Sequence, residues 1–189
     1  LFNTLNAISS LIVTRRPQDA EETVSRLSEF LRASLGADPQ GQVTLAGELD
    51  TLHAYLDIER VRFGARLRFE VSSEPGLETA RVPSFILQPL VENAVKYAVA
   101  PSRRGATIRV SAARDAADGL RLVVEDDGEG LPLRDKTVRT GVGLNNVRRR
   151  LNVLYESRAE MVAGPAPKGG FRVELALPLI AGGGAGDGT

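Results

Sequence analysis

The chain has 189 residues, with 24 lysines and arginines balanced by 24 aspartates and glutamates. A chain with no net charge offers no electrostatic reason to expect nucleic acid or an anionic membrane as its main partner. It contains no cysteine, which excludes disulfides and thiolate metal sites and fits a reducing cytoplasm. No apolar run approaches the roughly 20 residues of a membrane span. This length holds one good core, or one core and a small helical appendage.

Two amphipathic helices are predicted at the amino-terminal end. Apolar side chains recur at helical spacing at Leu1, Leu5, Ile8 and Ile12. The Arg-Arg-Pro-Gln sequence at residues 15–18 interrupts this pattern, and a second helix runs to Gly36, a glycine suited to a C-cap. A hairpin this small leaves an apolar stripe uncovered. We expect it to dimerise into a four-helix bundle, to lie against another domain, or to pack on the main core.

A third helix is predicted from Leu45 to Phe63, after a loop between Gly36 and Thr44. It carries the single histidine, His53. No second histidine, cysteine or acidic cluster stands beside it at metal-ligand spacing. We therefore predict a structural role for His53.

Alternating apolar and polar residues predict strands in the rest of the chain. The apolar positions are Leu67, Phe69 and Val71; Ile108, Val110 and Ala112; Leu120, Leu122 and Val124; Ala159, Met161 and Ala163; and Phe171, Val173, Leu175 and Leu177. The second and third runs flank Asp118-Gly119, which predicts a β-hairpin. The last two runs flank a Gly/Pro turn and complete a sheet.

The stretch Leu87-Gln-Pro-Leu-Val-Glu-Asn-Ala-Val-Lys-Tyr-Ala98 predicts a helix that starts after Pro83-Ser84. Opposite its apolar face, Asn93, Lys96 and Tyr97 stand at i, i+3 and i+4, with Glu92 one row over. For this segment alone, the simpler explanation is a surface helix with one Glu–Lys pair. Two later glycine-rich stretches change that judgement.

The first glycine-rich stretch, Asp126-Asp-Gly-Glu-Gly130, directly follows a predicted strand. Gly128 and Gly130 allow a sharp turn and a close approach to a ligand, and a carboxylate at the strand end can accept a hydrogen bond from an exocyclic amine. The turn offers too few oxygens for a calcium loop. For this turn in isolation, a plain acidic β-turn is the favoured explanation.

The second stretch, Thr140-Gly-Val-Gly-Leu-Asn-Asn146, leads into a predicted helix over residues 147–155. Glycines that open a helix present free N–H groups and the positive helix end to an anion such as phosphate. The chain lacks both the third glycine of the dinucleotide fingerprint and a phosphate loop of the Gly-x-x-x-x-Gly-Lys type. Residues 131–139 are predicted to form a mobile lid, and residues 182–189 a disordered tail.

These motifs resemble a known family. Asn93-Ala-Val-Lys-Tyr97 is similar to the N box, residues 126–130 to the G1 box, and Gly141-Val-Gly-Leu144 to the G2 box of one ATPase fold. Gyrase, the heat-shock chaperone of that class, histidine kinases and the mismatch-repair ATPase share this fold. The sequences at residues 1–8, 55–64 and 88–94 resemble LytS-type sensor histidine kinases. The resemblance extends over residues 1–178.

The resemblance implies a role for each box. Asn93 would hold Mg²⁺ against the triphosphate, Lys96 would contact phosphate, Tyr97 would line the nucleotide site, and Asp126 would accept from the adenine amino group. The remaining implied site residues are Gly128, Gly130, Gly141, Gly143 and Leu144. These roles agree with the chemistry of the residue types, since an oxygen ligand suits a hard cation and a lysine suits phosphate.

One position departs from the family. Many relatives have a second asparagine four residues before the N-box asparagine, and here that position is Pro89. Gln88 or Glu92 is the replacement candidate at the metal site, and the general base stays unassigned. In LytS-type kinases a Pro-His-Phe sequence precedes Leu-Phe-Asn, and its histidine accepts the phosphoryl group. This chain starts at Leu1, so we expect the acceptor to lie upstream.

The predicted fold is α+β: an α/β sandwich of the Bergerat type, with a mixed or antiparallel sheet and helices on one face, after a truncated helical hairpin. We expect a helical dimerisation and phosphotransfer region at residues 1–64, an ATP-binding catalytic domain at 65–180, and a tail at 181–189.

The implied function is the catalytic part of a two-component sensor histidine kinase. It would transfer the γ-phosphoryl of Mg-ATP to an upstream histidine and then to an aspartate of a response regulator. The resemblance implies a homodimer formed through the hairpin and a cytoplasmic location for this part of a membrane-attached sensor, with no nucleic-acid partner. By itself the piece should bind ATP without phosphorylating itself. Two alternatives are a serine kinase of the anti-sigma type on the same ATPase fold, and a catalytically inactive nucleotide-binding or dimerisation module.

Overall fold

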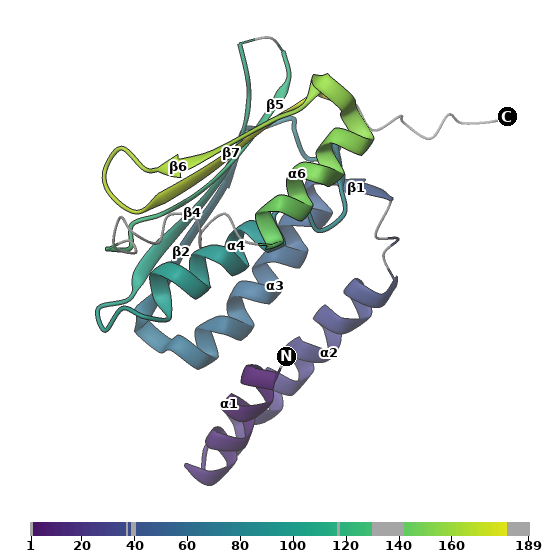
Figure 1. The fold of residues 1–189 in the computed structure, drawn as a ribbon. Helices are drawn as coiled ribbons and strands as arrows, with labels where there is room; N and C mark the ends of the chain where they lie inside the picture. Colours follow the sequence, from purple (N-terminus) through teal and green to yellow (C-terminus); the bar gives the residue numbers. More distant parts are fainter. Residues whose placement is uncertain (1, 37, 39–40, 117, 130–141, 181–189) are drawn as a thin grey trace, which may run out of the picture.

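The computed structural model describes residues 2–36, 38, 41–116, 118–129 and 142–180 (Figure 1). The helices are α1 (Phe2–Val13), α2 (Pro17–Gly36), α3 (Leu45–Phe63), α4 (Gln88–Ala94) and α6 (Val142–Tyr155), with a π-helical turn at Val95–Val99 and single 3₁₀ turns at Gly64–Arg66 and Glu156–Arg158. The strands are β1 (Gln42–Thr44), β2 (Leu67–Ser73), β3 (Arg81–Pro83), β4 (Ala106–Arg114), β5 (Leu120–Asp126), β6 (Glu160–Pro165) and β7 (Phe171–Leu177).

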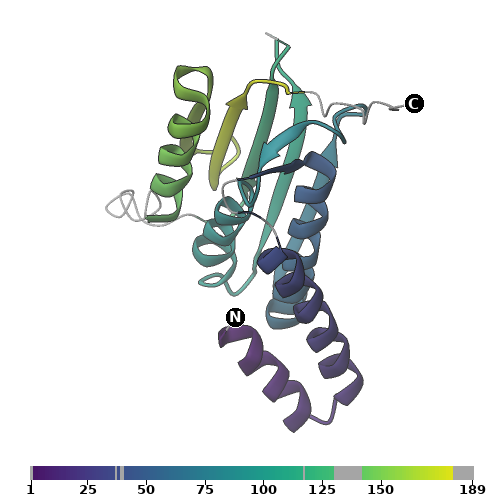
Figure 2. The same ribbon diagram turned by 90° about the vertical axis from the view of Figure 1, so that its right-hand side faces the viewer.

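A five-stranded sheet in the order β2-β4-β5-β7-β6 forms one layer of the molecule. The β2–β4 pair is parallel and the other pairs are antiparallel. Figures 1 and 2 show α3, α4 and α6 together on one face of this sheet. The expected mixed sheet with helices on one face is therefore confirmed.

The core lies between that sheet face and the three helices. Because successive strand residues point to opposite faces, Ile108 and Val110 on β4 and Leu122 on β5 are buried beneath the helices. The intervening positions carry charge: Arg109 pairs with Glu70 at 3.2 Å across the opposite face. Charges on that face keep it hydrated, so the sheet forms a two-layer sandwich with the helices.

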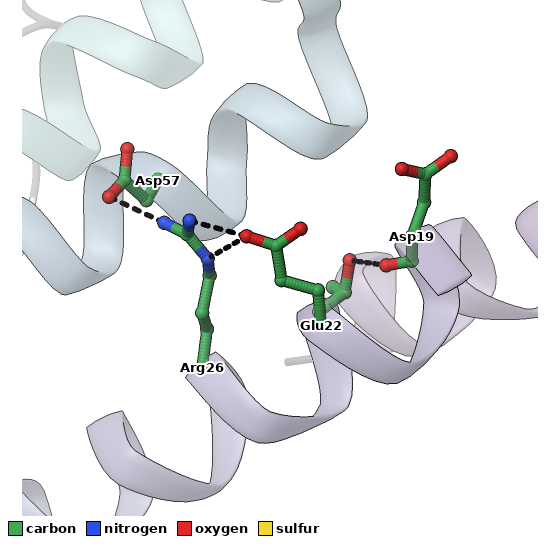
Figure 3. Close-up of polar contacts among 5 residues, drawn as sticks. Asp19, Glu22, Arg26 and Asp57 are labelled. Atoms are coloured by element: carbon green, nitrogen blue, oxygen red, sulfur yellow. Dashed lines mark hydrogen bonds and ion pairs between the residues drawn. The ribbon is translucent and has the colours of Figure 1, made fainter. Parts of the chain in front are cut away.

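The α1–α2 hairpin packs against α3 of the same chain. Ile58 of α3 joins a second apolar cluster whose hairpin members are Ile8, Leu11, Ala20, Leu27 and Phe30. Figure 3 shows the polar edge of this contact, where Arg26 donates to Asp57 of α3 at 2.6 Å and to Glu22 of its own helix at 2.6 Å. Partly exposed pairs of this kind stabilise a protein by only about 0–1 kcal/mol, so the apolar cluster holds the hairpin.

The hairpin keeps an uncovered apolar stripe on α1. Ile12 is 61% exposed and Val13 is 81% exposed. Packing on α3 therefore satisfies only part of the predicted apolar surface. None of the helices in the described part of the chain is long and apolar enough to cross a membrane.

Two segments differ from the sequence prediction. Residues 42–44, expected within a loop, form β1 and pair with β3 in a separate two-stranded sheet. The helix expected to start after Pro83-Ser84 begins only at Gln88, because residues 84–87 form a turn in which Phe85 has a φ of 56°. A left-handed residue cannot continue a right-handed helix, which delays the start of α4.

Candidate functional site

The N-box segment forms α4 followed by the π-helical turn. Asn93 lies near the end of α4, whereas Lys96 and Tyr97 lie in the turn, where the Ala100 N–H donates to the Val95 carbonyl at 2.9 Å. Such a five-residue bond widens the helix and is frequent at functional sites. Asn93 and Tyr97 are half-buried and Lys96 is exposed. The wider turn therefore changes the angle about the helix axis at which Lys96 and Tyr97 stand relative to Asn93.

Glu92 and Lys96, the ion pair expected on a plain surface helix, make other contacts. Glu92 accepts a hydrogen bond from the Gln88 amide at 2.8 Å. The Lys96 ammonium lies 4.9 Å from the centre of the Tyr97 ring, a cation–π distance. Lys96 thus keeps its charge available at the exposed end of the segment.

Asp126 ends β5 on the helix-covered face of the sheet and is only 2% exposed. Its Oδ1 accepts a hydrogen bond from the Gly128 N–H at 3.1 Å. A carboxylate is costly to bury unless hydrogen-bond donors face it. Its position at the base of the helix-covered layer suits recognition of a buried amine.

Gly170, which the motifs did not identify, lies close to Asp126. Its φ is +85°, and a Cβ added there would stand 1.9 Å from the Asp126 carbonyl oxygen and 3.0 Å from its Oδ1. Only glycine permits this approach of β7 to Asp126. The Gly169-Gly170 pair was visible in the sequence as a turn, but its partner 44 positions earlier was not.

Gly128 brings the G1 turn against the N-box helix. A Cβ added at Gly128 would lie 2.5 Å from the Ala98 Cβ and 2.9 Å from its Cα. The next carboxylate fixes the other side of the turn, since Asp127 Oδ1 accepts the Thr107 N–H of β4 at 2.6 Å. The G1 turn therefore packs against Ala98, the residue that directly follows the N box.

The G2 box begins α6 instead of preceding it. Gly143 and Leu144 lie in the first turn of the helix, which starts at Val142, five residues earlier than predicted. Leu144 is 3% exposed and belongs to the core, so it anchors the start of this helix. A Cβ at Gly143 would meet nothing within 4 Å. Gly130, Gly141 and the predicted lid and tail lie outside the described residues.

The donor set fits a nucleotide with a hard cation. Asn93 offers an amide oxygen, Lys96 a cation and Asp126 a buried acceptor, the groups suited to Mg²⁺, phosphate and an exocyclic amine. Across the described ranges, no cluster of three or more His, Asp or Glu side chains could hold a metal ion. A Mg²⁺ ion at Asn93 would thus take most of its ligands from phosphate and water, as Mg²⁺ commonly does.

Comparison with known proteins identifies two matching families. Residues 1–67 match the family described as histidine kinase, and residues 78–181 match the family described as histidine kinase-, DNA gyrase B-, and HSP90-like ATPase. The sensor histidine kinase/phosphatase LytS of Staphylococcus aureus strain MRSA252 is 34% identical over 170 residues, 85% of this chain and 29% of that protein. The chain thus spans less than a third of the curated relatives it matches.

Solved structures share the fold at lower identity. The histidine kinase domain of the Erythrobacter litoralis EL346 blue-light activated histidine kinase has a TM-score of 0.58 and 20% identity, covering 94% of this chain and 93% of that one. The Acinetobacter baumannii histidine kinase AdeS has a TM-score of 0.54 and 15% identity, covering 89% and 84%. Both likenesses extend across hairpin and sandwich together.

Proposed function

The chain belongs to the histidine kinase-, DNA gyrase B- and HSP90-like ATPase family, and from this membership we propose that it is the ATP-binding catalytic part of a two-component sensor histidine kinase. The whole protein would transfer the γ-phosphoryl of Mg-ATP to a histidine upstream of Leu1 and then to an aspartate of a response regulator. The histidine kinase match over the hairpin favours this function over a serine kinase of the anti-sigma type.

One observation carries the proposal: the buried Asp126 carboxylate touches Gly128, which in turn touches the helix that bears Asn93. In this proposal Asp126 accepts the adenine amino group, Asn93 holds Mg²⁺, and Lys96 and Tyr97 contact the phosphates and line the site. Bound Mg-ATP supplies the phosphoryl group. The chain's residues bind and orient it, since positioning and charge neutralisation account for most catalysis of phosphoryl transfer.

We also propose that the protein forms a homodimer through its α1–α2 hairpin. The exposed α1 stripe with Ile12 and Val13 supports dimerisation through the hairpin, because an uncovered apolar helix face gains by pairing with a second copy. We propose that residues 1–64 serve dimerisation and phosphotransfer and that residues 65–180 bind ATP. This part of the protein would lie in the cytoplasm, where ATP and a response regulator are available.

The test is calorimetric titration of the chain with Mg-ATP. Asp126→Asn places an amide N–H₂ where an acceptor is needed, so affinity should fall by about 1–3 kcal/mol, or roughly 5- to 150-fold. Asp118→Asn is the matched control, because Asp118 is exposed at the far end of β5 and its φ of 58° suits asparagine. An unchanged affinity in Asp126→Asn, with wild type binding normally, would refute the role of Asp126. Absence of binding in the wild type would refute the function, including the alternative of an inactive nucleotide-binding module.

A further inference from the structure

The turn that precedes α4 is held by a carboxylate from another helix. Glu48, in the first turn of α3, is 4% exposed, and it accepts the N–H groups of Phe85 at 2.8 Å and Leu87 at 2.9 Å. Leu87 occupies the N-cap of α4 and supplies no side-chain hydrogen bond of its own. Glu48 therefore satisfies amides at the start of α4 that would otherwise lack partners.

A cation from α6 closes the same turn. Arg150 Nη1 donates to the Ser84 carbonyl, and its charge acts on the Glu48 carboxylate. Ser84 is itself tied to the Gly41 carbonyl through its N–H at 3.2 Å and its hydroxyl at 3.1 Å. Three helices, α3, α4 and α6, thus meet at residues 84–87.

The arrangement is energetically demanding for a purely structural contact. A left-handed residue such as Phe85 costs on the order of 1–3 kcal/mol and persists only where its surroundings over-determine it. Burial raises the pKa of Glu48, whereas the hydrogen bonds from the backbone amides and the charge of Arg150 act to lower it. Apolar residues of similar volume often stabilise a protein as well as buried charged groups do. A buried carboxylate that accepts two N–H groups of this turn, with the half-exposed Arg150 bonded to the same turn, is better explained by the direction it gives that helix.

We propose that Glu48 and Arg150 are positioning residues for the nucleotide site: by holding the turn at residues 84–87, they orient α4 so that Asn93 meets the Mg²⁺-bound phosphates. The inference rests on the proposed function. Neither side chain needs to touch the nucleotide. Glu48 belongs to α3, which contacts the hairpin, and Arg150 belongs to α6, which begins at the G2 box. The two residues therefore connect both helices to the start of α4.

Glu48→Gln is the informative variant. The amide keeps the volume but loses the charge that faces Arg150 and replaces one acceptor with a donor that meets the Phe85 or Leu87 N–H. Calorimetry with Mg-ATP should show affinity at least about tenfold weaker than wild type. Titration of ATP with EDTA should show a much smaller change, because the loss concerns the Mg²⁺-dependent contact at Asn93. A general disruption of the fold would weaken both titrations alike.

Two further comparisons make the test decisive. Glu78→Gln is the matched control, since the exposed Glu78 also accepts a backbone N–H, from Gly76 at 3.2 Å, and it should bind Mg-ATP like wild type. In an Asn93→Ala background, Glu48→Gln should cause no further loss, because both changes remove the same contact. Additive losses, or a loss equal with and without Mg²⁺, would overturn the proposal.

Folding is checked by circular dichroism at the titration temperature. If Glu48→Gln does not fold, Arg150→Gln replaces it in all arms, because Arg150 is half-exposed and its loss leaves the Glu48 bonds to Phe85 and Leu87 in place. Normal Mg-ATP affinity in the folded variant would overturn the positioning role while leaving the ATP-binding function intact. Failure of wild type to bind ATP would instead remove the proposed function.

Discussion

Gly128→Ala tests whether the contact between the G1 turn and the N-box helix builds the site. The added Cβ would stand 2.5 Å from the Ala98 Cβ and 2.9 Å from its Cα. Carbon atoms pack at about 3.5–4.0 Å, so turn and helix must separate by about 1 Å. Overpacking of this kind typically costs about 1–3 kcal/mol, and the lower entropy of unfolded alanine returns about 0.4–1 kcal/mol. The net loss, at most about 2.6 kcal/mol, would lower Tm by up to about 10 °C.

The same separation moves Asp126 away from the helix that bears Asn93, so ATP affinity should fall at least about fivefold, the lower limit for one lost buried hydrogen bond. Differential scanning calorimetry and ATP titration measure the two effects. Gly164→Ala is the control, because a Cβ at Gly164 on β6 would meet nothing within 4 Å. If Gly128→Ala matches this control in both Tm and affinity, the contact does not shape the site.

Three further predictions concern the G2 helix, pH and phosphorylation. Gly143→Ala should keep or raise Tm, because it fills open space in a helix, yet weaken ATP binding if phosphate approaches that backbone; equal affinity in titration would contradict the phosphate role. Burial raises the pKa of Glu48 above its ordinary 4.5, so the folded state holds that proton more tightly, and its contribution to the free energy of unfolding should decline as pH rises from 4.5 through the raised pKa. Urea titrations across that range should show a steeper decline in wild type than in Glu48→Gln, which keeps the part due to Glu59, whose pKa burial also raises; an equal slope in the two proteins would contradict the assignment. With γ-labelled ATP the chain should acquire no label, because the proposed acceptor lies upstream of Leu1 and we predict a structural role for His53, which packs edge-on against Phe69 at 6.0 Å. A label lost in His53→Ala would show that His53 is the acceptor, and an acid- and base-stable label would favour a serine kinase.

Local pattern predicted most of the elements. The periodicity of α3 was correct from Leu45 to Phe63, and the alternation of the five sheet strands identified their buried faces. These patterns are legible because burial on one face repeats every 3.6 or 2 residues along the chain. The order of the three boxes is likewise a property of the chain itself, and it indicates the same family as the comparison with known proteins.

The tertiary structure decided what lies between the elements. The Glu48 bond to Leu87 spans 39 positions and the Arg150 bond to Ser84 spans 66. The contacts of Gly128 with Ala98 and of Gly170 with Asp126 likewise join separate elements. Periodicity reports which residues are buried, but not which distant residue each one meets. An isolated glutamate in a helix, or a glycine in a turn, therefore has no distinguishing pattern until folding brings its partner to it.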